Sequence, residues 1–307
     1  LITGFSEEVL DDKVLNCFER MQEDGIAPDD VTFIGYLKIC GNMNVASKGQ
    51  DVYSEIVKKG FEKDHFISSV LVDMYAQCGM LAGARRILEE LPIRNVVSWN
   101  ALIGGHVQLG QGREALDCFE QMQKEGLFPD VVTFICILKA CGSTREVHKG
   151  KQFHDEIVAR GLLKQDDFLG YALVDMYAKC GLLAKAQEVF EKLRVRNIIS
   201  WSALIAGYVQ DGLVREALTC FEKMQSEGFS PDEVTFLCVL SACGFSGLFD
   251  DAQIIFENMA KRYEISPNLK HHTYLVGAFG CGGHFNKAMS VIKSMPCIEY
   301  PLVWRAL

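Results

Sequence analysis

Polar side chains that can exchange hydrogen bonds with a planar ligand lie at two fixed places in a segment that repeats along the chain. They occupy the fifth residue and the last residue of each repeat. The pairs are Ser69 with Asn95, Asn100 with Asp130, Tyr171 with Asn197, Ser202 with Asp232, and Thr273 with Tyr300. A small polar group beside a carboxylate or amide offers the donors and acceptors that the edge of a nucleic-acid base requires. The spacing therefore predicts base-reading pairs of the kind that some repeat proteins use.

The second residue of each repeat is apolar. Residues three apart share one face of an α-helix, so the second residue lies beside the fifth. The apolar second residues are Phe66, Val97, Val132, Phe168, Ile199 and Val234. We expect such residues from adjacent repeats to sandwich a base between them. In one type of repeat the fifth residue is also apolar and offers a base no hydrogen bond; these are Ile34, Ile135 and Leu237.

The residue at the end of each repeat also has a purely structural interpretation. Asp130 and Asp232 directly precede the segments VVTF and EVTF. An aspartate in that place caps the first turn of a helix. Capping and base reading are compatible, so both interpretations stand at this point.

One motif suggests catalysis but is incomplete. His154-Asp155-Glu156 matches the H-x-E half of a zinc deaminase signature. The other half, P-C-x-x-C, is missing, because Pro296-Cys297 is followed by Ile-Glu-Tyr. We therefore predict no catalytic residue, no metal ligand and no cofactor within this chain.

The cysteines and tryptophans follow the repeats. The chain has 12 cysteines. Nine recur in three sets, which are Cys17, Cys118 and Cys220, then Cys40, Cys141 and Cys243, then Cys78, Cys180 and Cys281. Equivalent positions in stacked repeats are too far apart for a shared metal or a disulfide, so we expect small buried thiols in a reducing compartment. Trp99, Trp201 and Trp304 share the fourth position, where we expect aromatic residues of the core.

The repeats form a cycle of three types. Val96–Asp130 returns as Ile198–Asp232, and His65–Asn95 returns as Asp167–Asn197. The third type carries the VTF segments. The predicted boundaries are 1–29 (incomplete), 30–64, 65–95, 96–130, 131–166, 167–197, 198–232, 233–268 and 269–300, with a further motif beginning at 301–307. The cycle starts and stops in mid-repeat and there is no initiator methionine, so we expect a fragment of a longer protein.

Each repeat has the length of two short antiparallel helices. In the repeat from Ile198, we expect a first helix over about Ser200 to Gln210, a break at Asp211-Gly212 and a second helix over about Arg215 to Glu227. A pair this small cannot bury its apolar stripe alone, whereas stacked pairs form a continuous core. We predict an all-α fold, an α-solenoid superhelix of about nine stacked antiparallel helix pairs.

The overall composition limits the classes of function. The 307 residues are 49% hydrophobic, which supplies ample core, and no apolar run is long enough to span a membrane. The formal net charge is −9. An acidic chain is poorly suited to indiscriminate nucleic-acid binding, which depends on basic surfaces. It remains suited to a site that reads bases by stacking and hydrogen bonds.

The repeat motifs resemble those of a known family. SWNALIGGHVQLG with EALDCFEQMQKEGLFPD, VTFICILKACG, and LVDMYAKCG resemble the P, L and S motifs of plant pentatricopeptide repeat (PPR) proteins of the PLS subfamily. The repeats at 233–268 and 269–300 resemble the terminal L2 and S2 motifs, and PLVWRAL resembles the start of the E1 motif. The resemblance covers the entire chain.

This resemblance implies sequence-specific binding of single-stranded RNA in a chloroplast or mitochondrion. Proteins with this arrangement mostly specify sites of C-to-U RNA editing. Some carry a DYW deaminase domain after the E motifs and others recruit a deaminase in trans. The resemblance also implies partners, the multiple organellar RNA editing factor proteins, at L motifs. The fragment itself is expected to bind RNA without catalysing a reaction.

The resemblance further implies a base code. Ser69 with Asn95 would read A, Asn100 with Asp130 would read U with C tolerated, and Ser202 with Asp232 would read G. Tyr171 with Asn197 departs from the code through its bulky phenol, and Thr273 with Tyr300 departs at its last residue. The implied RNA element is A-U-n-n-G-n-n from the repeat that begins at His65.

A second class of function remains open. Helical-pair solenoids also bind peptides or helper proteins in a concave groove. The acidic balance and the apolar fifth residues Ile34, Ile135 and Leu237 favour such a protein–protein scaffold. RNA binding weakens as salt rises, whereas an apolar peptide groove does not, so salt dependence separates the two.

Overall fold

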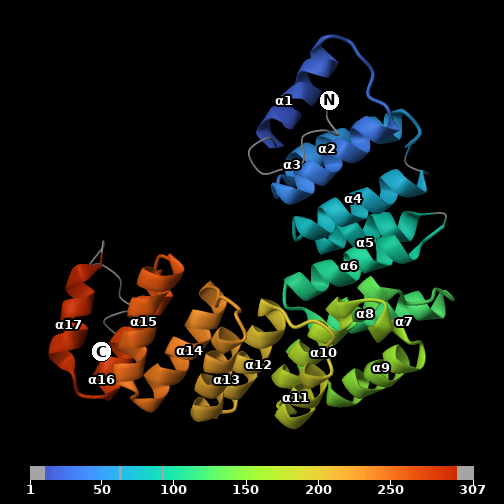
Figure 1. Ribbon diagram of the computed structural model, residues 1–307. Helices are drawn as coiled ribbons and strands as arrows, with labels where there is room; N and C mark the ends of the chain where they lie inside the picture. Colours follow the sequence, from blue (N-terminus) through green and yellow to red (C-terminus); the bar gives the residue numbers. More distant parts are fainter. Residues whose placement is uncertain (1–10, 62–63, 92, 296–307) are drawn as a thin grey trace. The chain divides into compact units, whose positions relative to one another are not determined.

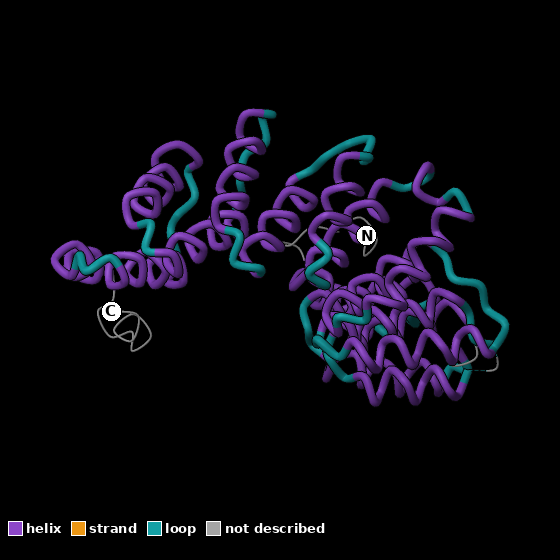
Figure 2. The backbone as a smooth tube through the Cα atoms, turned by 90° about the horizontal axis from the view of Figure 1, so that it is seen from below, coloured by secondary structure: helices purple, strands orange, loops and turns teal. Residues whose placement is uncertain are grey.

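The computed structural model describes residues 11–61, 64–91 and 93–295. Over these ranges the chain forms seventeen α-helices, one short 3-10 helix and no strand (Figures 1 and 2). The prediction of an all-α fold is confirmed. The chain divides into two compact bodies, an N-terminal body of residues 1–144 and a C-terminal body of residues 145–307.

In the N-terminal body, successive helices pair and stack. Its helices are α1 (Asp11–Glu23), α2 (Asp30–Asn42), α3 (Ala46–Lys58), α4 (His65–Gln77), α5 (Leu81–Glu90), α6 (Val96–Gln108), α7 (Gly112–Lys124) and α8 (Val131–Thr144). The even-numbered helices contact one another in order, α2 with α4, α4 with α6 and α6 with α8. Each of α3, α5 and α7 lies against the even-numbered helix before it. This two-layer stacking of helix pairs is that of an α-solenoid.

The C-terminal body is built in the same way. Its helices are α9 (Val147–Ala159), η3 (Leu162–Lys164), α10 (Asp167–Lys179), α11 (Leu183–Glu191), α12 (Ile198–Gln210), α13 (Val214–Ser226), α14 (Glu233–Ser246), α15 (Phe249–Tyr263), α16 (Leu269–Cys281) and α17 (Phe285–Ser294). Here α10, α12, α14 and α16 contact in succession, and α11, α13, α15 and α17 complete the pairs.

Local sequence explains where the helices begin and end. The predicted helices of the repeat from Ile198 are observed as α12 and α13, with ends at most two residues from those expected. The turn between them contains Gly212 at φ 72°, a left-handed conformation that glycine adopts without strain. The sequence predicts an apolar stripe of Ala217, Leu218, Phe221 and Met224 on α13; Leu218 is half-buried and the other three are buried.

The two described tryptophans belong to the core, as predicted. Trp99 and Trp201 are 4% and 1% exposed. The Trp99 Nε1 donates to Glu125 Oε2 at 3.0 Å. Trp201 instead packs edge-on against Phe190, with ring centroids 4.6 Å apart. Trp304 lies outside the described residues, as do Tyr300 and the predicted E1 motif.

The thiols are less uniformly buried than predicted. Cys118 and Cys220 are buried, and burial raises the pKa of the Cys220 thiol to about 12. The equivalent Cys17 is exposed. Cys281 is also exposed, at the last residue of α16.

Close approach of stacked helices depends on small residues. A Cβ atom at Gly105 would lie 2.8 Å from the Cβ of Ala76 and 3.3 Å from its Cα. A Cβ atom at the neighbouring Gly104 would meet nothing closer than Cys136 Sγ at 3.8 Å. Both glycines lie inside α6, so they differ in packing and not in backbone conformation.

We predict opposite effects for the two alanine substitutions. Gly105→Ala should lower the free energy of unfolding by about 1–3 kcal/mol, because α6 must move away from α4. Gly104→Ala should raise it by up to about 1 kcal/mol, because alanine favours the helix. Urea midpoints followed by circular dichroism measure both, and equal effects would contradict the packing argument.

Candidate functional site

The residue before each first helix acts as its N-cap. The Asp130 side chain accepts a hydrogen bond from the backbone N–H of Thr133 at 2.8 Å, and Asp232 accepts one from Thr235 at 2.8 Å. Asn95 and Asn197 cap α6 and α12 in the same way. The structural interpretation of these residues is therefore confirmed. Capping also fixes where their remaining polar atoms lie.

Asn100 and Asp130 lie side by side. The Asn100 Nδ2 donates to Asp130 Oδ1 at 2.9 Å. Asn100 is on the first turns of α6, and Asp130 is reached only after α7 and the following turn. Stacking of α6 against α8 therefore joins the fifth and last residues of one predicted repeat. The second carboxylate oxygen, Asp130 Oδ2, has no donor among the described residues.

Ser202 and Asp232 are joined through a third residue. The Ser202 and Asp232 side chains share no direct hydrogen bond. The Ser202 Oγ lies 2.6 Å from Thr235 Oγ1, which donates to Asp232 Oδ1 at 2.6 Å. The equivalent Thr133 Oγ1 lies 2.7 Å from Asn100 Oδ1 and 2.8 Å from Asp130 Oδ1. We call the contact between the fifth residue of one first helix and the N-cap of the next first helix a junction. Thr133 and Thr235 are fully buried residues of two such junctions. The sequence analysis did not predict them, although each lies in a VTF segment.

The remaining predicted pairs differ. Asn95 Nδ2 donates to Ser69 Oγ at 3.2 Å, so this pair is in direct contact. Tyr171 turns aside, and its hydroxyl donates to the backbone oxygen of Val195 at 3.1 Å. Tyr171 and Asn197 therefore form no polar pair of the predicted kind. Thr273 donates to the backbone oxygen of Leu269 at 2.8 Å, and its predicted partner Tyr300 lies outside the described residues.

The predicted base-sandwiching residues are exposed apolar side chains. In the N-terminal body Phe66 is 64% exposed, Val97 63% and Val132 52%. In the C-terminal body the exposed fractions are 60% for Phe168, 58% for Ile199 and 58% for Val234. Each lies on the first turn of a first helix. The second residue of each of these repeats therefore keeps more than half of its side chain exposed.

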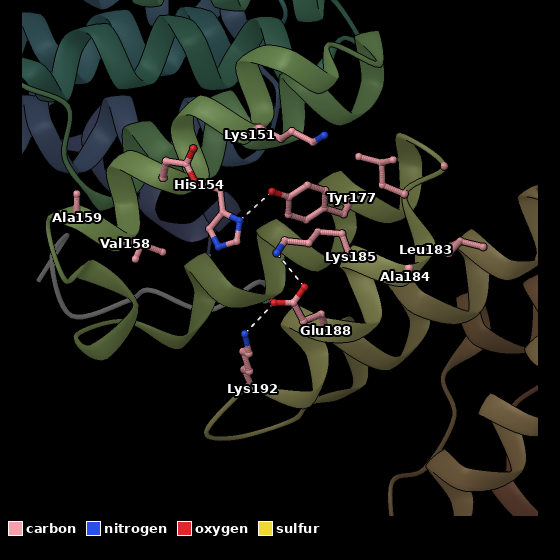
Figure 3. A pocket seen from close by; sticks show the side chains of 13 residues that line it. Lys151, His154, Val158, Ala159, Tyr177, Leu183, Ala184, Lys185, Glu188 and Lys192 are labelled. Atoms are coloured by element: carbon pink, nitrogen blue, oxygen red, sulfur yellow. Dashed lines mark hydrogen bonds and ion pairs between the residues drawn. The ribbon is translucent and has the colours of Figure 1, made fainter.

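The H-x-E motif does not form a catalytic constellation. His154 Nδ1 and the Tyr177 hydroxyl share a hydrogen bond of 2.8 Å, while Glu156 forms an ion pair with Arg160, the C-cap of the same helix. Figure 3 shows His154 facing Tyr177 beside a cleft of about 910 Å³. Across this cleft, Glu188 is already paired with Lys185 and Lys192 at 2.8 Å each. Lys151 and Asp155 also line the cleft.

Among the described residues, no cluster of three or more His, Cys, Asp or Glu side chains is arranged to hold a metal ion. None of the described helices is both long and apolar enough to cross a membrane.

The stacked helix pairs and their polar junctions define a helical repeat protein of the α-solenoid class. A PPR repeat family model matches residues 94–143 and 196–244. A PPR repeat model matches residues 66–96, 172–198 and 234–263. Together these models cover more than half of the chain, and the chain belongs to the PPR repeat family.

Similar proteins from Arabidopsis thaliana are also named as pentatricopeptide repeat-containing proteins. The putative pentatricopeptide repeat-containing protein At3g28640 is 36% identical over 290 residues, which are 94% of this chain and 58% of that protein. The pentatricopeptide repeat-containing protein At1g06140, mitochondrial, is 34% identical over 308 residues, which span 100% of this chain and 55% of that protein. The chain thus spans little more than half the length of these relatives.

A solved structure has the same fold. It is the crystal structure of the pentatricopeptide repeat protein PPR10 in complex with an 18-nt psaJ RNA element. The TM-score is 0.77 at 22% identity, over 92% of this chain and 42% of that chain. At this identity the likeness shows the fold.

The half-buried His154 predicts a pH dependence of stability. Burial, followed by the nearby Lys185, lowers the pKa of His154 from its ordinary 6.5. Below about pH 6.5 the unfolded chain takes up a proton that the folded chain resists. Stability from neutral His154 is therefore complete above this pH and is lost as the pH falls toward the folded pKa.

We expect His154→Gln to lose less stability than the parent protein between about pH 7.5 and pH 5. Urea unfolding at the two pH values measures the loss. His148→Gln is the matched control, because His148 is an exposed residue of the same helix, and it should lose as much as the parent. Equal losses in all three proteins would show that His154 does not set this dependence.

Proposed function

We propose that this chain binds single-stranded RNA and reads its sequence one base per repeat. The observation that carries the proposal is the contact between Asn100 and Asp130 next to the exposed Val97 and Val132. Such a junction offers hydrogen bonds to a base edge and apolar side chains to its two faces. The reading residues and the sandwiching residues are those predicted from the sequence. The RNA-bound structure of PPR10, which shares the fold, supports this choice of ligand.

The chemistry of each junction supports a different base. Asn100 offers an N–H donor and a carbonyl acceptor, which complement the N3–H and flanking carbonyl of uracil. Ser202 with Asp232 would read G, and Ser69 with Asn95 would read A. The proposed element is A-U-n-n-G-n-n, with no base assigned to Tyr171 and Asn197.

The proposed biological role is site recognition for organellar C-to-U RNA editing. The order of P, L and S motifs, ending in L2 and S2, supports this role, and one relative is named as mitochondrial. The location would be a mitochondrion or a chloroplast. The partners would be multiple organellar RNA editing factor proteins at the L motifs, together with a deaminase supplied in cis or in trans. This chain would supply recognition and no catalysis.

A protein–protein scaffold is the second candidate. The net charge of −9 and the half-buried apolar fifth residues Ile34, Ile135 and Leu237 favour it. In this role the exposed apolar second residues would contact a peptide. The same binding experiments distinguish the two candidates.

The first test is a titration with a short single-stranded RNA containing A-U-n-n-G. We expect each single-base change at A, U or G to weaken binding by roughly 1–3 kcal/mol, by analogy with base readout elsewhere. The same titration is repeated with a DNA copy of the sequence and at increasing salt concentrations. Affinity for RNA should fall as salt rises. Equal weak binding to every sequence would contradict base reading and favour the scaffold.

The sandwich predicts an effect of its own. Phe168→Ala should weaken RNA binding by about 1–3 kcal/mol, the usual size of a base–aromatic stack. Phe128→Ala is the control, because Phe128 is 79% exposed in a loop and is not the second residue of a repeat. Both side chains are mostly exposed, so neither change should unfold the protein. Equal losses of affinity in the two variants would argue against the sandwich.

A further inference from the structure

The Ser202–Asp232 junction contains a buried hydroxyl that the base code does not include. Thr235 is the third residue of the helix that follows Asp232, and it is fully buried. Its Oγ1 lies 2.6 Å from both Ser202 Oγ and Asp232 Oδ1. The backbone N–H of Thr235 also donates to Asp232 Oδ1 at 2.8 Å. Thr235 thus stands between the two proposed reading residues.

The protons in this chain can be assigned. A carboxylate only accepts hydrogen bonds, and a hydroxyl has a single proton. If Thr235 donated to Ser202, its oxygen would face the charged Asp232 oxygen at 2.6 Å with no proton between them. Thr235 therefore donates to Asp232. Ser202 must then donate its own proton to Thr235, which leaves Ser202 with lone pairs alone for any other partner.

We propose that Thr235 is a positioning residue that fixes the hydrogen-bond polarity of the Ser202–Asp232 pair. With its proton committed, Ser202 Oγ presents only an acceptor, and Asp232 Oδ2, which has no donor among the described residues, presents another. Guanine carries two neighbouring donors, N1–H and N2–H, on its pairing edge, whereas adenine carries an acceptor, N1, beside its N6 donor. An acceptor-only site therefore selects guanine. This inference rests on the proposed RNA-binding function.

At the Asn100–Asp130 junction, the equivalent threonine is Thr133, and the hydrogen-bond polarity is different. Thr133 Oγ1 is within 2.8 Å of acceptor oxygens on both Asn100 and Asp130, and its single proton satisfies one of these two acceptors. Asn100 donates one N–H to Asp130 and retains its second N–H and a carbonyl lone pair. The junction is left with both a donor and an acceptor. The buried threonine thus takes part in the hydrogen bonds inside the junction. The fifth residue determines which donors and acceptors are left for a base.

At the junctions that contain Asn95 and Asn197, no hydroxyl at the threonine position contacts the fifth residue. Ser98 occupies the position equivalent to Thr133, but its hydroxyl donates back to the Asn95 backbone oxygen at 2.9 Å. Ser200 does the same to Asn197 at 2.9 Å. These hydroxyls serve the helix cap and do not reach the fifth residue. The contrast separates a threonine that only caps from one that also contacts a reading residue.

The test uses Thr235→Val, which keeps the shape and removes the hydroxyl, and Thr235→Ser, which restores it. Affinity is measured for two RNAs that differ only by G or A at the fifth base of A-U-n-n-G. In Thr235→Val, Ser202 regains a proton that it can donate to adenine, so the preference for G over A should fall by roughly tenfold. Thr235→Ser should keep the preference.

Thr32→Val is the matched control. Thr32 makes the same cap with Asp29, at 2.8 Å through its backbone N–H, beside no proposed reading pair. It should lose a comparable amount of thermal stability and keep the G preference. If Thr235→Val weakens both RNAs equally, Thr235 only caps the helix and the inference is overturned while base reading stands. If the parent protein prefers neither base, both the inference and the proposed function are overturned.

Discussion

The N-cap hydrogen bond at the start of each first helix is the constraint on which the proposed site depends. A helix leaves its first backbone N–H groups without partners, and a preceding Asp or Asn supplies an acceptor. Asp130 and Asp232 do so with one carboxylate oxygen each. The bond holds the carboxylate at a fixed place beside the preceding first helix. A side chain needed for folding is thereby oriented for recognition.

Stacking converts this local bond into a pair. The fifth residue of one first helix faces the next first helix only because small residues such as Gly105 let the helices approach closely. The residue at the fifth position then determines which hydrogen bonds link the two helices at the junction. Asn100 reaches the carboxylate directly, Ser202 is linked to it through Thr235, and Tyr171 is too large and turns to a backbone oxygen. One backbone frame therefore supports several different hydrogen-bonding surfaces.

The sequence predicted those features that repeat, and the structure supplied those that depend on side-chain reach. Helical periodicity and glycine turns located α12 and α13, and the Asp and Asn spacing located the caps. The contact of Asn100 with Asp130 followed from the same spacing. The bridge through Thr235 could not be anticipated, because the repeat pattern does not reveal whether a fifth-position serine contacts the last residue directly, as Ser69 does, or through a threonine, as Ser202 does.

Charge pairing within the protein bears on how such a surface would bind RNA. Arg94 is paired with Glu125, and Arg196 lies 3.0 Å from Glu227 at the equivalent position of a later repeat. Arg194 is paired with Asp167 at 3.0 Å. These three arginines are engaged by acidic partners, and the chain carries a net charge of −9, so they add little to the attraction of phosphates by the remaining cationic side chains. Affinity would then combine salt-dependent phosphate contacts with stacking on the exposed apolar residues and hydrogen bonds at the junctions. Because the non-specific part of this affinity is reduced in an acidic protein, a mismatch in one junction would be poorly compensated, which favours sequence selectivity.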